Sequence, residues 1–295
     1  MAQFGLFIQQ MVNGLSIGGV YGLSAIGYAL IYSVFGFSNF VHGEFTMVGA
    51  FVALFTASSL NAPFAVSVLA GMAGAAITAV LVERVAYSPL QNRRAPSLYF
   101  FVSAMGMSIL LQNLGIVTLG ATFRTFPLKL PIETIRFGNI SVGAIDILTF
   151  FLSICGVFLL EAILKYTRTG RAIRAVAYDS YAASLMGINI SRTSMAVFLL
   201  AGLLAGLSGV LRGVSYTIYP TMGSIVIKIW VCAILGGLGS VSGAFVGGIL
   251  LGVIETLVSG YISSSYRDVF TFVLLIAVLL IRPAGLMGKT VEEKA

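Results

Sequence analysis

Long apolar segments separated by short polar connections dominate the chain. A helix needs about 20 mainly apolar residues to cross the hydrocarbon core of a bilayer. The pattern therefore predicts an all-α fold, a polytopic transmembrane helical bundle of about eight spans. One transmembrane domain is expected over residues 1–295. The predicted spans cover residues 6–34, 42–60, 63–83, 98–119, 143–164, 193–213 and 269–281.

Residues 224–260 are also apolar, but the glycine-rich stretch 236–240 interrupts them. The two arms, 224–237 and 243–259, are short for complete crossings. Irregular backbone is tolerated at membrane depth only where protein or a watery cavity surrounds it. We therefore expect a broken or re-entrant helical hairpin here.

Composition supports the membrane assignment and excludes several other classes. Hydrophobic residues make up 58% of the chain and charged residues 9%, whereas soluble domains carry about 25% charged residues. The net charge of +7 does not indicate nucleic-acid binding, because the basic residues lie between apolar spans and form no stripe. The two cysteines, Cys155 and Cys232, lie inside apolar stretches and make no disulfide framework.

The distribution of lysine and arginine predicts the orientation. Cytoplasmic loops carry an excess of these residues, which places 84–97, 165–192 and the C-terminus in the cytoplasm, with the loop 120–142 and the N-terminus outside. The cytoplasmic set is Arg84, Arg93, Arg94, Lys165, Arg168, Arg171, Arg174, Arg192, Arg282, Lys289 and Lys294, and the opposite set is Arg124, Lys129, Arg136 and Arg267.

Glycines recur at helix-packing spacing. Residues without a Cβ let two helix backbones approach closely inside a membrane. We expect these glycines to pack the bundle itself, with a dimerisation face as the alternative. The GxxxG pairs are Gly14/Gly18, Gly18/Gly22, Gly202/Gly206, Gly209/Gly213, Gly243/Gly247 and Gly248/Gly252.

Enzymatic chemistry finds little support in the sequence. His42 is the single histidine, and HExxH and CxxC motifs are absent. The tail 285–290 reads Gly-x2-Gly-Lys-Thr, whereas a phosphate loop needs Gly-x4-Gly-Lys-Thr to surround phosphates. We therefore expect no cofactor, nucleotide or metal on this chain, and neither a catalytic residue nor a membrane-embedded enzyme.

The connection 165–192 contains a predicted short helix. Asp179 or Ser180 can cap a helix that runs to Met186, with Gly187 just past its end. Its apolar residues exceed what a solvated loop requires. Such a helix either lies on the lipid surface or fits a groove in a soluble partner.

Polar residues inside predicted spans are costly and are candidates for function. Asn13, Gln112 and Asn113 either line a pathway or hydrogen-bond a neighbouring helix. Lys228 and Glu255 lie on opposite arms of the hairpin, where pairing would offset the burial cost of each charge.

A second group of polar residues lies at ends of spans. Asn39, His42 and Glu44 precede or begin the second span, where they either form a gate or hold the break together by hydrogen bonds. Arg212, near the outer mouth, either attracts a carboxylate or extends to lipid headgroups.

Several motifs in order resemble those of one transporter family. Tyr181-Ala182-Ala183-x3-Gly187 resembles the EAA-x3-G coupling loop of ABC importer permeases, with Tyr181 in place of the glutamate. The resemblance covers nearly the whole chain, and it is to the LivH-type permeases of high-affinity branched-chain amino-acid ABC importers. The other matching segments are 13–14, 22–32, 39–45, 83–90, 109–113, 187–189, 235–240 and 282–286.

The resemblance implies a multi-subunit importer in the bacterial inner membrane. A second homologous permease, two cytoplasmic ATPases that carry ATP and Mg²⁺, and a periplasmic solute-binding protein are the implied partners, besides the lipid bilayer. The substrate stays open among branched-chain and other amino acids, urea and small organic acids. The implied ATPase-docking residues are Tyr178, Asp179, Tyr181, Ala182, Ala183, Leu185, Met186 and Gly187.

A self-sufficient secondary transporter or channel for small polar solutes is the alternative interpretation. It needs an ion- or proton-coupling site, and the few ionisable residues within the predicted spans do not cluster. Uptake by this chain alone in liposomes would favour it.

Overall fold

A computed structural model describes residues 2–93, 95–127, 134–137 and 140–288. Five residues used in the sequence-based predictions lie outside the described residues: Arg94, Lys129, Lys289, Thr290 and Lys294. The elements are α1 (Ala2–Phe35), α2 (His42–Ser59), α3 (Phe64–Val82), the π-helical turn η1 (Glu83–Tyr87), α4 (Ser88–Asn92), α5 (Ser97–Leu119), β1 (Thr134–Phe137), β2 (Ile140–Gly143), α6 (Ala144–Tyr166), α7 (Arg168–Tyr178), α8 (Ser180–Leu185), α9 (Ile190–Ser215), η2 (Met222–Ile225), α10 (Val226–Gly236), α11 (Val241–Tyr261), η3 (Ser264–Tyr266) and α12 (Arg267–Ile281).

Within the described chain, seven helical segments are long and apolar enough to cross a membrane. The prediction of a polytopic helical bundle is confirmed. The segments are Gly5–Phe35, Phe64–Asn92, Ser97–Leu119, Ala144–Tyr166, Ile190–Ser215, Val241–Tyr261 and Ser264–Ile281.

Two sequence-based boundaries need correction. The predicted span 42–60 forms an 18-residue helix, α2, which is not among the seven and carries the polar residues His42 and Glu44 in its first turn. In the glycine-interrupted hairpin only one arm is short: α10 has 11 residues, whereas α11 has 21 and is long enough to cross.

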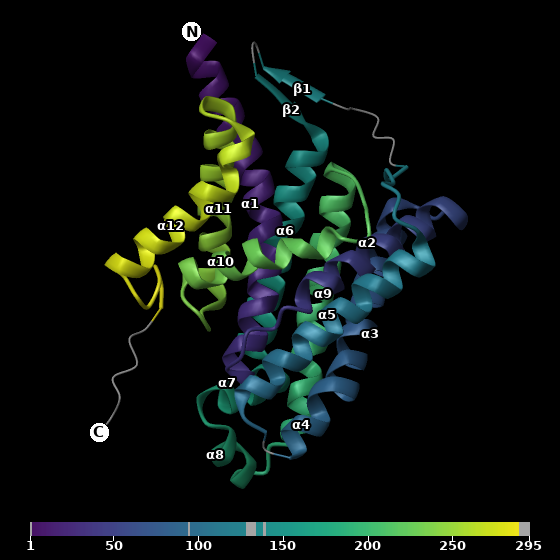
Figure 1. The fold of residues 1–295 in the computed structure, drawn as a ribbon, viewed down its shortest axis with the longest axis vertical. Helices are drawn as coiled ribbons and strands as arrows, with labels where there is room; N and C mark the ends of the chain where they lie inside the picture. The colour runs from purple at the N-terminus through teal and green to yellow at the C-terminus, as the bar shows by residue number, and fades with distance from the viewer. Residues whose placement is uncertain (1, 94, 128–133, 138–139, 289–295) are drawn as a thin grey trace.

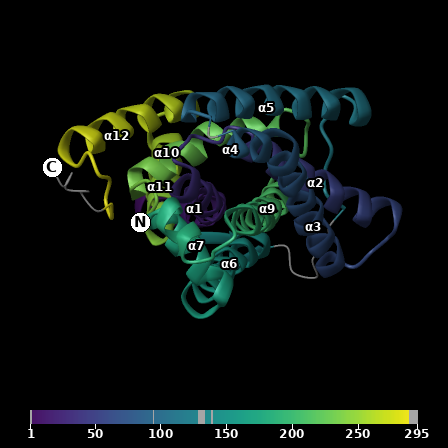
Figure 2. The same ribbon diagram turned by 90° about the horizontal axis from the view of Figure 1, so that it is seen from below.

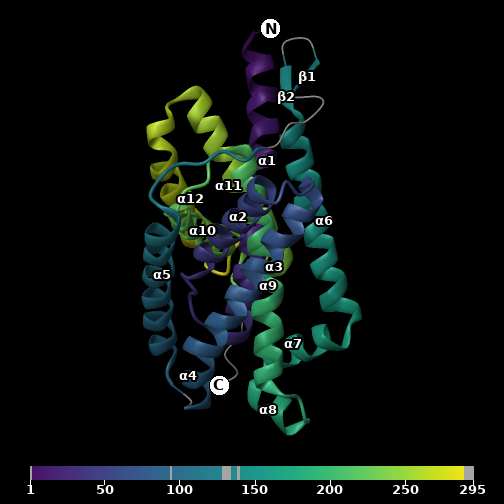
Figure 3. The same ribbon diagram turned by 90° about the vertical axis from the view of Figure 1, so that its right-hand side faces the viewer.

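A small β-hairpin adds to the helical architecture. β1 and β2 pair in antiparallel fashion, with Thr134 opposite Gly143 and Phe137 opposite Ile140. From the sequence, this segment was predicted to be part of an outer loop, and no strands were predicted in it. Figures 1 and 3 show the hairpin beside the N-terminus, at the opposite end of the bundle from α4, α7 and α8.

The basic connections α4 and α7–α8 therefore lie at the same end of the molecule (Figure 1). This arrangement agrees with the predicted orientation, in which both connections lie on one side of the membrane. We call this the basic end, and the end that carries the N-terminus and the β-hairpin the opposite end.

The centre of the bundle is formed by α1 and α9, which the view in Figure 2 shows surrounded by the other helices. Buried side chains cover much of both helices, including Leu23 and Ile26 of α1 and Phe198 of α9, all at 0% exposure. By contrast, α5 and α12 lie along the outside, in agreement with their many exposed apolar side chains.

Glycines bring the central helices into backbone contact. A Cβ at Gly18 of α1 would lie 2.7 Å from the Cα of Ile249 on α11, and a Cβ at Gly248 would meet the backbone of Gly22. On α9, a Cβ at Gly206 would lie 2.7 Å from the Cα of Met72 on α3. These GxxxG glycines pack helices of the same chain, which confirms the expectation of a tight bundle.

The chain enters the bundle interior between α1 and α2. Gly36 has a φ of +66°, a conformation that suits glycine, and it breaks the helix at the end of α1. The chain then turns back, so that His42 at the start of α2 contacts Ser24, well inside α1. The second interior element is α10, which lies across the bundle in Figure 1.

The glycine contacts between α1 and α11 generate a prediction. Gly248→Val should lower the yield of folded protein strongly, because the added side chain has to displace the backbone of Gly22, and such overpacking costs about 1–3 kcal/mol or more. Membrane yield and the elution profile in size-exclusion chromatography measure the effect. Gly106→Val on α5 is the matched control, since a Cβ there meets nothing within 4 Å; equal behaviour of the two variants would contradict the packing role.

Candidate functional site

At the basic end, the predicted short helix is present as α8. The Asp179 carboxylate caps it by accepting hydrogen bonds from the backbone N–H groups of Tyr181 (2.8 Å) and Ala182 (2.9 Å). The helix ends at Leu185, and Gly187 follows with a φ of +83°. Both the N-cap and the glycine stop expected from the sequence are confirmed.

α8 presents apolar side chains to its surroundings. Leu185 is 71% exposed and Met186 84% exposed, and the tyrosines Tyr178 and Tyr181 are exposed as well. Ala183 alone of this segment is buried and faces the bundle. Exposed apolar side chains of this size in one small segment are typical of an interaction surface.

The helix α7, which precedes α8 and packs against it, was not predicted from the sequence. α7 is amphipathic: Ile173 and Val176 are buried, while its arginines lie on the other side. Thr167 caps α7 by accepting a hydrogen bond from the N–H of Gly170 (3.0 Å), and the Arg174 guanidinium donates to the carbonyl of Leu164. The spacing of Gly170, Ile173 and Val176 at three-residue intervals was the available signal.

The polar residues at the start of α2 are buried and hydrogen-bonded. The hydroxyl of Tyr87 donates to Asn39 Oδ1 (2.8 Å), and His42 Nε2 lies 3.1 Å from the carbonyl oxygen of Ser24. Ser108 of α5 donates to Glu44 Oε1 (3.2 Å). These contacts connect the break before α2 to α1, η1 and α5. The hydrogen bonds that were expected to hold the break together are therefore present, and a gating role stays a prediction.

The remaining amide candidates make local contacts. Asn13 Oδ1 accepts from Gln9 on the same helix (3.2 Å), and Asn113 donates to the carbonyl of Ile109 one turn earlier (2.7 Å). Asn113 is exposed and Gln112 half-buried on α5. Within the described part of the chain, none of the three makes the interhelical hydrogen bond that was one of their two interpretations. Lining of a pathway stays a prediction.

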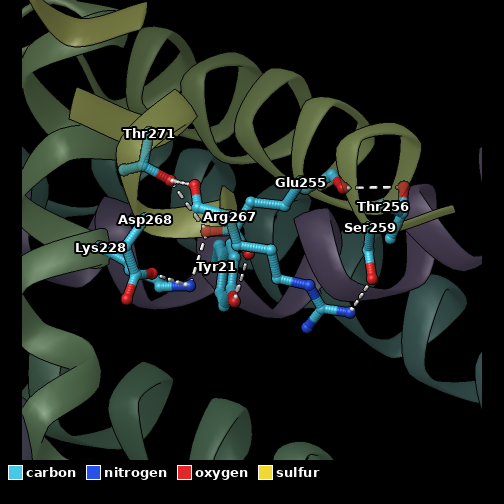
Figure 4. A network of polar contacts seen from close by, with 9 residues as sticks. Tyr21, Lys228, Glu255, Thr256, Ser259, Arg267, Asp268 and Thr271 are labelled. Carbon is cyan, nitrogen blue, oxygen red and sulfur yellow. Dashed lines mark hydrogen bonds and ion pairs between the residues drawn. The ribbon is translucent and has the colours of Figure 1, made fainter. Parts of the chain in front are cut away.

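Lys228 and Glu255 form the ion pair expected from the sequence. Lys228 Nζ lies 2.6 Å from Glu255 Oε1, and Figure 4 shows the surrounding network. The Tyr21 hydroxyl donates to Glu255 Oε2 (3.0 Å) and Thr271 to Glu255 Oε1 (3.0 Å), so the buried carboxylate is fully engaged. Lys228 also contacts Asp268 Oδ1 at 3.1 Å. One cluster thus connects α1, α10, α11 and α12.

A polar cavity of about 290 Å³ lies next to this network. We call it the outer cavity, because the first turn of α6, the last turn of α9 and the start of α12 all border it near the opposite end of the bundle. The sequence analysis singled out Arg212 and Lys228 but missed the others, since separate helices contribute them. Its lining residues are Ser16, Ile17, Val20, Tyr21, Asp146, Arg212, Ser215, Tyr216, Thr217, Tyr219, Lys228 and Arg267.

The two regions define a class of protein. Among the described residues, no group of three His, Cys, Asp or Glu side chains is placed to hold a metal ion. A membrane-crossing helical bundle with polar residues and a polar cavity in its interior is an arrangement that suits a membrane transport protein.

Comparison with known proteins identifies the family. The family model described as the branched-chain amino acid transport system permease component matches residues 10–279. The high-affinity branched-chain amino acid transport system permease protein LivH of Salmonella typhimurium is 38% identical over 99% of both chains. The chain belongs to this permease family and is a multi-pass membrane transport subunit, not an enzyme.

Two other proteins are similar to this chain at lower sequence identity. The ribose import permease protein RbsC of Escherichia coli is 28% identical over 92% of this chain and 85% of its own. Among solved structures, PsaBC from Streptococcus pneumoniae in complex with Fab covers 92% of this chain and 91% of its own, with a TM-score of 0.52 and 12% identity. At that identity the similarity extends to the fold only.

The ion-pair network generates a prediction. Lys228→Ala should lower the stability of the protein by up to about 3 kcal/mol, because removal of one partner leaves the other charge buried, and Glu255 is only 2% exposed. It should also impair transport or subunit assembly. Thermal unfolding in detergent and solute uptake measure the two effects.

The double variant Lys228→Met with Glu255→Gln is the matched control, because it removes both charges and keeps the side-chain volumes similar. It should unfold closer to the wild-type temperature than Lys228→Ala does. Normal solute uptake at normal membrane levels in Lys228→Ala would contradict the predicted role of Lys228 in transport or subunit assembly.

Proposed function

We propose that this chain is one of two permease subunits of an ABC importer that moves branched-chain amino acids across the bacterial inner membrane. The observation that carries the proposal is the 38% identity to a branched-chain amino acid permease over 99% of both chains. The full-length similarity includes both the outer cavity and the α7–α8 segment. In this proposal the whole chain is one permease domain.

The proposed partners follow from the two ends of the molecule. A solute-binding protein delivers the amino acid at the opposite end, where the outer cavity lies. Two ATPase subunits bind ATP and Mg²⁺ at the basic end, and a second homologous permease completes the pathway. The chain itself needs no cofactor in this arrangement.

α8 is the proposed docking element for an ATPase. Its exposed apolar residues and its Asp179 cap support this role, since a short rigid helix projecting from the membrane can enter a groove in a soluble protein. Tyr181 stands at the glutamate position of the EAA-x3-G motif that this segment resembles, and it is 69% exposed. An aromatic side chain supplies the contact area that interface hot spots favour.

The docking role predicts the effect of a charge on α8. Met186→Glu should leave the membrane level of the permease unchanged, because the side chain is 84% exposed. It should reduce co-purification of the ATPase subunits at least about tenfold, since burying an unpaired carboxylate in an interface costs more than about 1.4 kcal/mol. Met186→Leu, which preserves the apolar character and volume, is the matched control and should retain the ATPases. Full ATPase recovery with Met186→Glu would rule out docking through this residue.

Reconstituted uptake tests the proposed function as a whole. Liposomes that contain this chain, the second permease and the ATPases should accumulate radiolabelled L-leucine only when ATP is inside and the binding protein is outside. Liposomes with this chain alone should show no uptake above empty liposomes. Leucine uptake by the chain alone would favour a self-sufficient transporter, and ATP-driven uptake of ribose in place of leucine would reject the amino-acid assignment.

A further inference from the structure

The charges that line the outer cavity are not all balanced within the chain. Lys228 is neutralised by Glu255 and Asp268, at 2.6 and 3.1 Å. Among the described residues, neither Arg212 nor Arg267 has an ion-pair partner. Among the described residues, two guanidinium groups thus border the cavity without a carboxylate at ion-pair distance.

The two arginines are held in place by uncharged groups. Arg212 Nη1 donates to the carbonyl oxygen of Met222 (3.1 Å), and Arg267 Nη2 donates to Ser259 Oγ (2.8 Å). Arg267 Nε is buried and has no hydrogen-bond partner in the described part of the chain. A buried donor without a partner is costly, so the hydrogen bonding of Arg267 within the described chain is incomplete.

A carboxylate borders the same cavity. Asp146, in the first turn of α6, accepts a hydrogen bond from Ser16 Oγ (3.1 Å) and has no cationic partner among the described residues. Because it forms no ion pair with either arginine, the cavity contains separated unpaired charges of both signs. A ligand that carries one charge of each sign matches this pattern.

The cavity also has an apolar portion. Ile17 and Val20 of α1 line it next to the polar groups. Its volume of about 290 Å³ is near the lower end of the range for small-molecule sites, about 300–1,000 Å³. A solute as small as one amino acid suits this size, and a branched aliphatic side chain suits Ile17 and Val20.

We propose that the outer cavity is a binding site for a zwitterionic α-amino acid, with its carboxylate on Arg212 and Arg267 and its ammonium on Asp146. The inference rests on the proposed function and gives it a location within this chain. The site binds weakly, because a transported solute has to leave again. Lys228 lines the cavity, and its ion pair with Glu255 keeps it from competing for the carboxylate.

Three ligands that differ by one charged group test the site. L-Leucine carries both groups, 4-methylpentanoate lacks the ammonium, and 3-methylbutylamine lacks the carboxylate. Saturation-transfer NMR on the purified permease–ATPase complex in nanodiscs, without the binding protein, measures weak binding of each ligand. Wild-type complex should bind leucine more tightly than either analogue.

The variants should act selectively. Arg212→Gln and Arg267→Gln should each weaken leucine and 4-methylpentanoate about tenfold, as expected for loss of a charge-assisted hydrogen bond, and leave 3-methylbutylamine unchanged. Asp146→Asn should weaken leucine and 3-methylbutylamine but leave 4-methylpentanoate unchanged. Arg212→Lys keeps the charge and should retain most of the leucine binding, which separates lost charge from lost folding.

Arg124→Gln is the matched control, since Arg124 is exposed at the same end but does not line the cavity. It should bind all three ligands like the wild type. Unchanged leucine binding in the Arg212, Arg267 and Asp146 variants, or equal weakening of all three ligands, would overturn the site. If the wild type still showed ATP-driven leucine uptake, those results would contradict only the proposed site and not the proposed importer function. Absence of uptake despite selective binding would reject the importer role instead.

Discussion

Close backbone contact between α1 and α11 is the interaction on which the rest of the structure depends. Lipid offers apolar helices no hydrophobic reason to associate, so contact area and hydrogen bonds have to hold them together. The reciprocal approach of Gly18 and Gly22 to Gly248 and Gly252 supplies that contact along the length of both helices. With α1 fixed in this way, α9 packs on another side of it through contacts such as the hydrogen bond from Ser208 to the carbonyl of Val20 (3.0 Å).

The central pair also makes the polar interior possible. A charged or polar side chain inside a membrane has to meet a partner from another helix, and rigid helices can place such partners accurately. Tyr21 reaches Glu255 across the α1–α11 contact, and Ser24 receives His42 at the start of α2. The same rigid helices surround the irregular segments before α2 and before α10, as irregular backbone inside a membrane requires.

One helix links the two regions with candidate roles. α9 begins a few residues after α8, where Asn189 caps it by accepting a hydrogen bond from the N–H of Arg192 (3.0 Å). Its last turn carries Arg212, which lines the outer cavity. α9 is buried over most of its length. The segment after α9 returns into the bundle, where the carbonyl of Met222 accepts a hydrogen bond from Arg212. The cavity wall and the α8 surface thus belong to neighbouring parts of the chain.

The sequence by itself determined the helical membrane class, most span positions, the cap and stop of α8, and the pairing of Lys228 with Glu255. These features depend on local composition or on spacing within one helix, or on the high cost of a lone charge in lipid. It did not reveal that α2 begins deep in the bundle, that α7 is a helix, or that Asp146, Arg212 and Arg267 border one cavity. Only the tertiary structure decided these points, because they depend on which helices meet, and contacts between α1, α6, α9 and α12 join residues far apart in the chain.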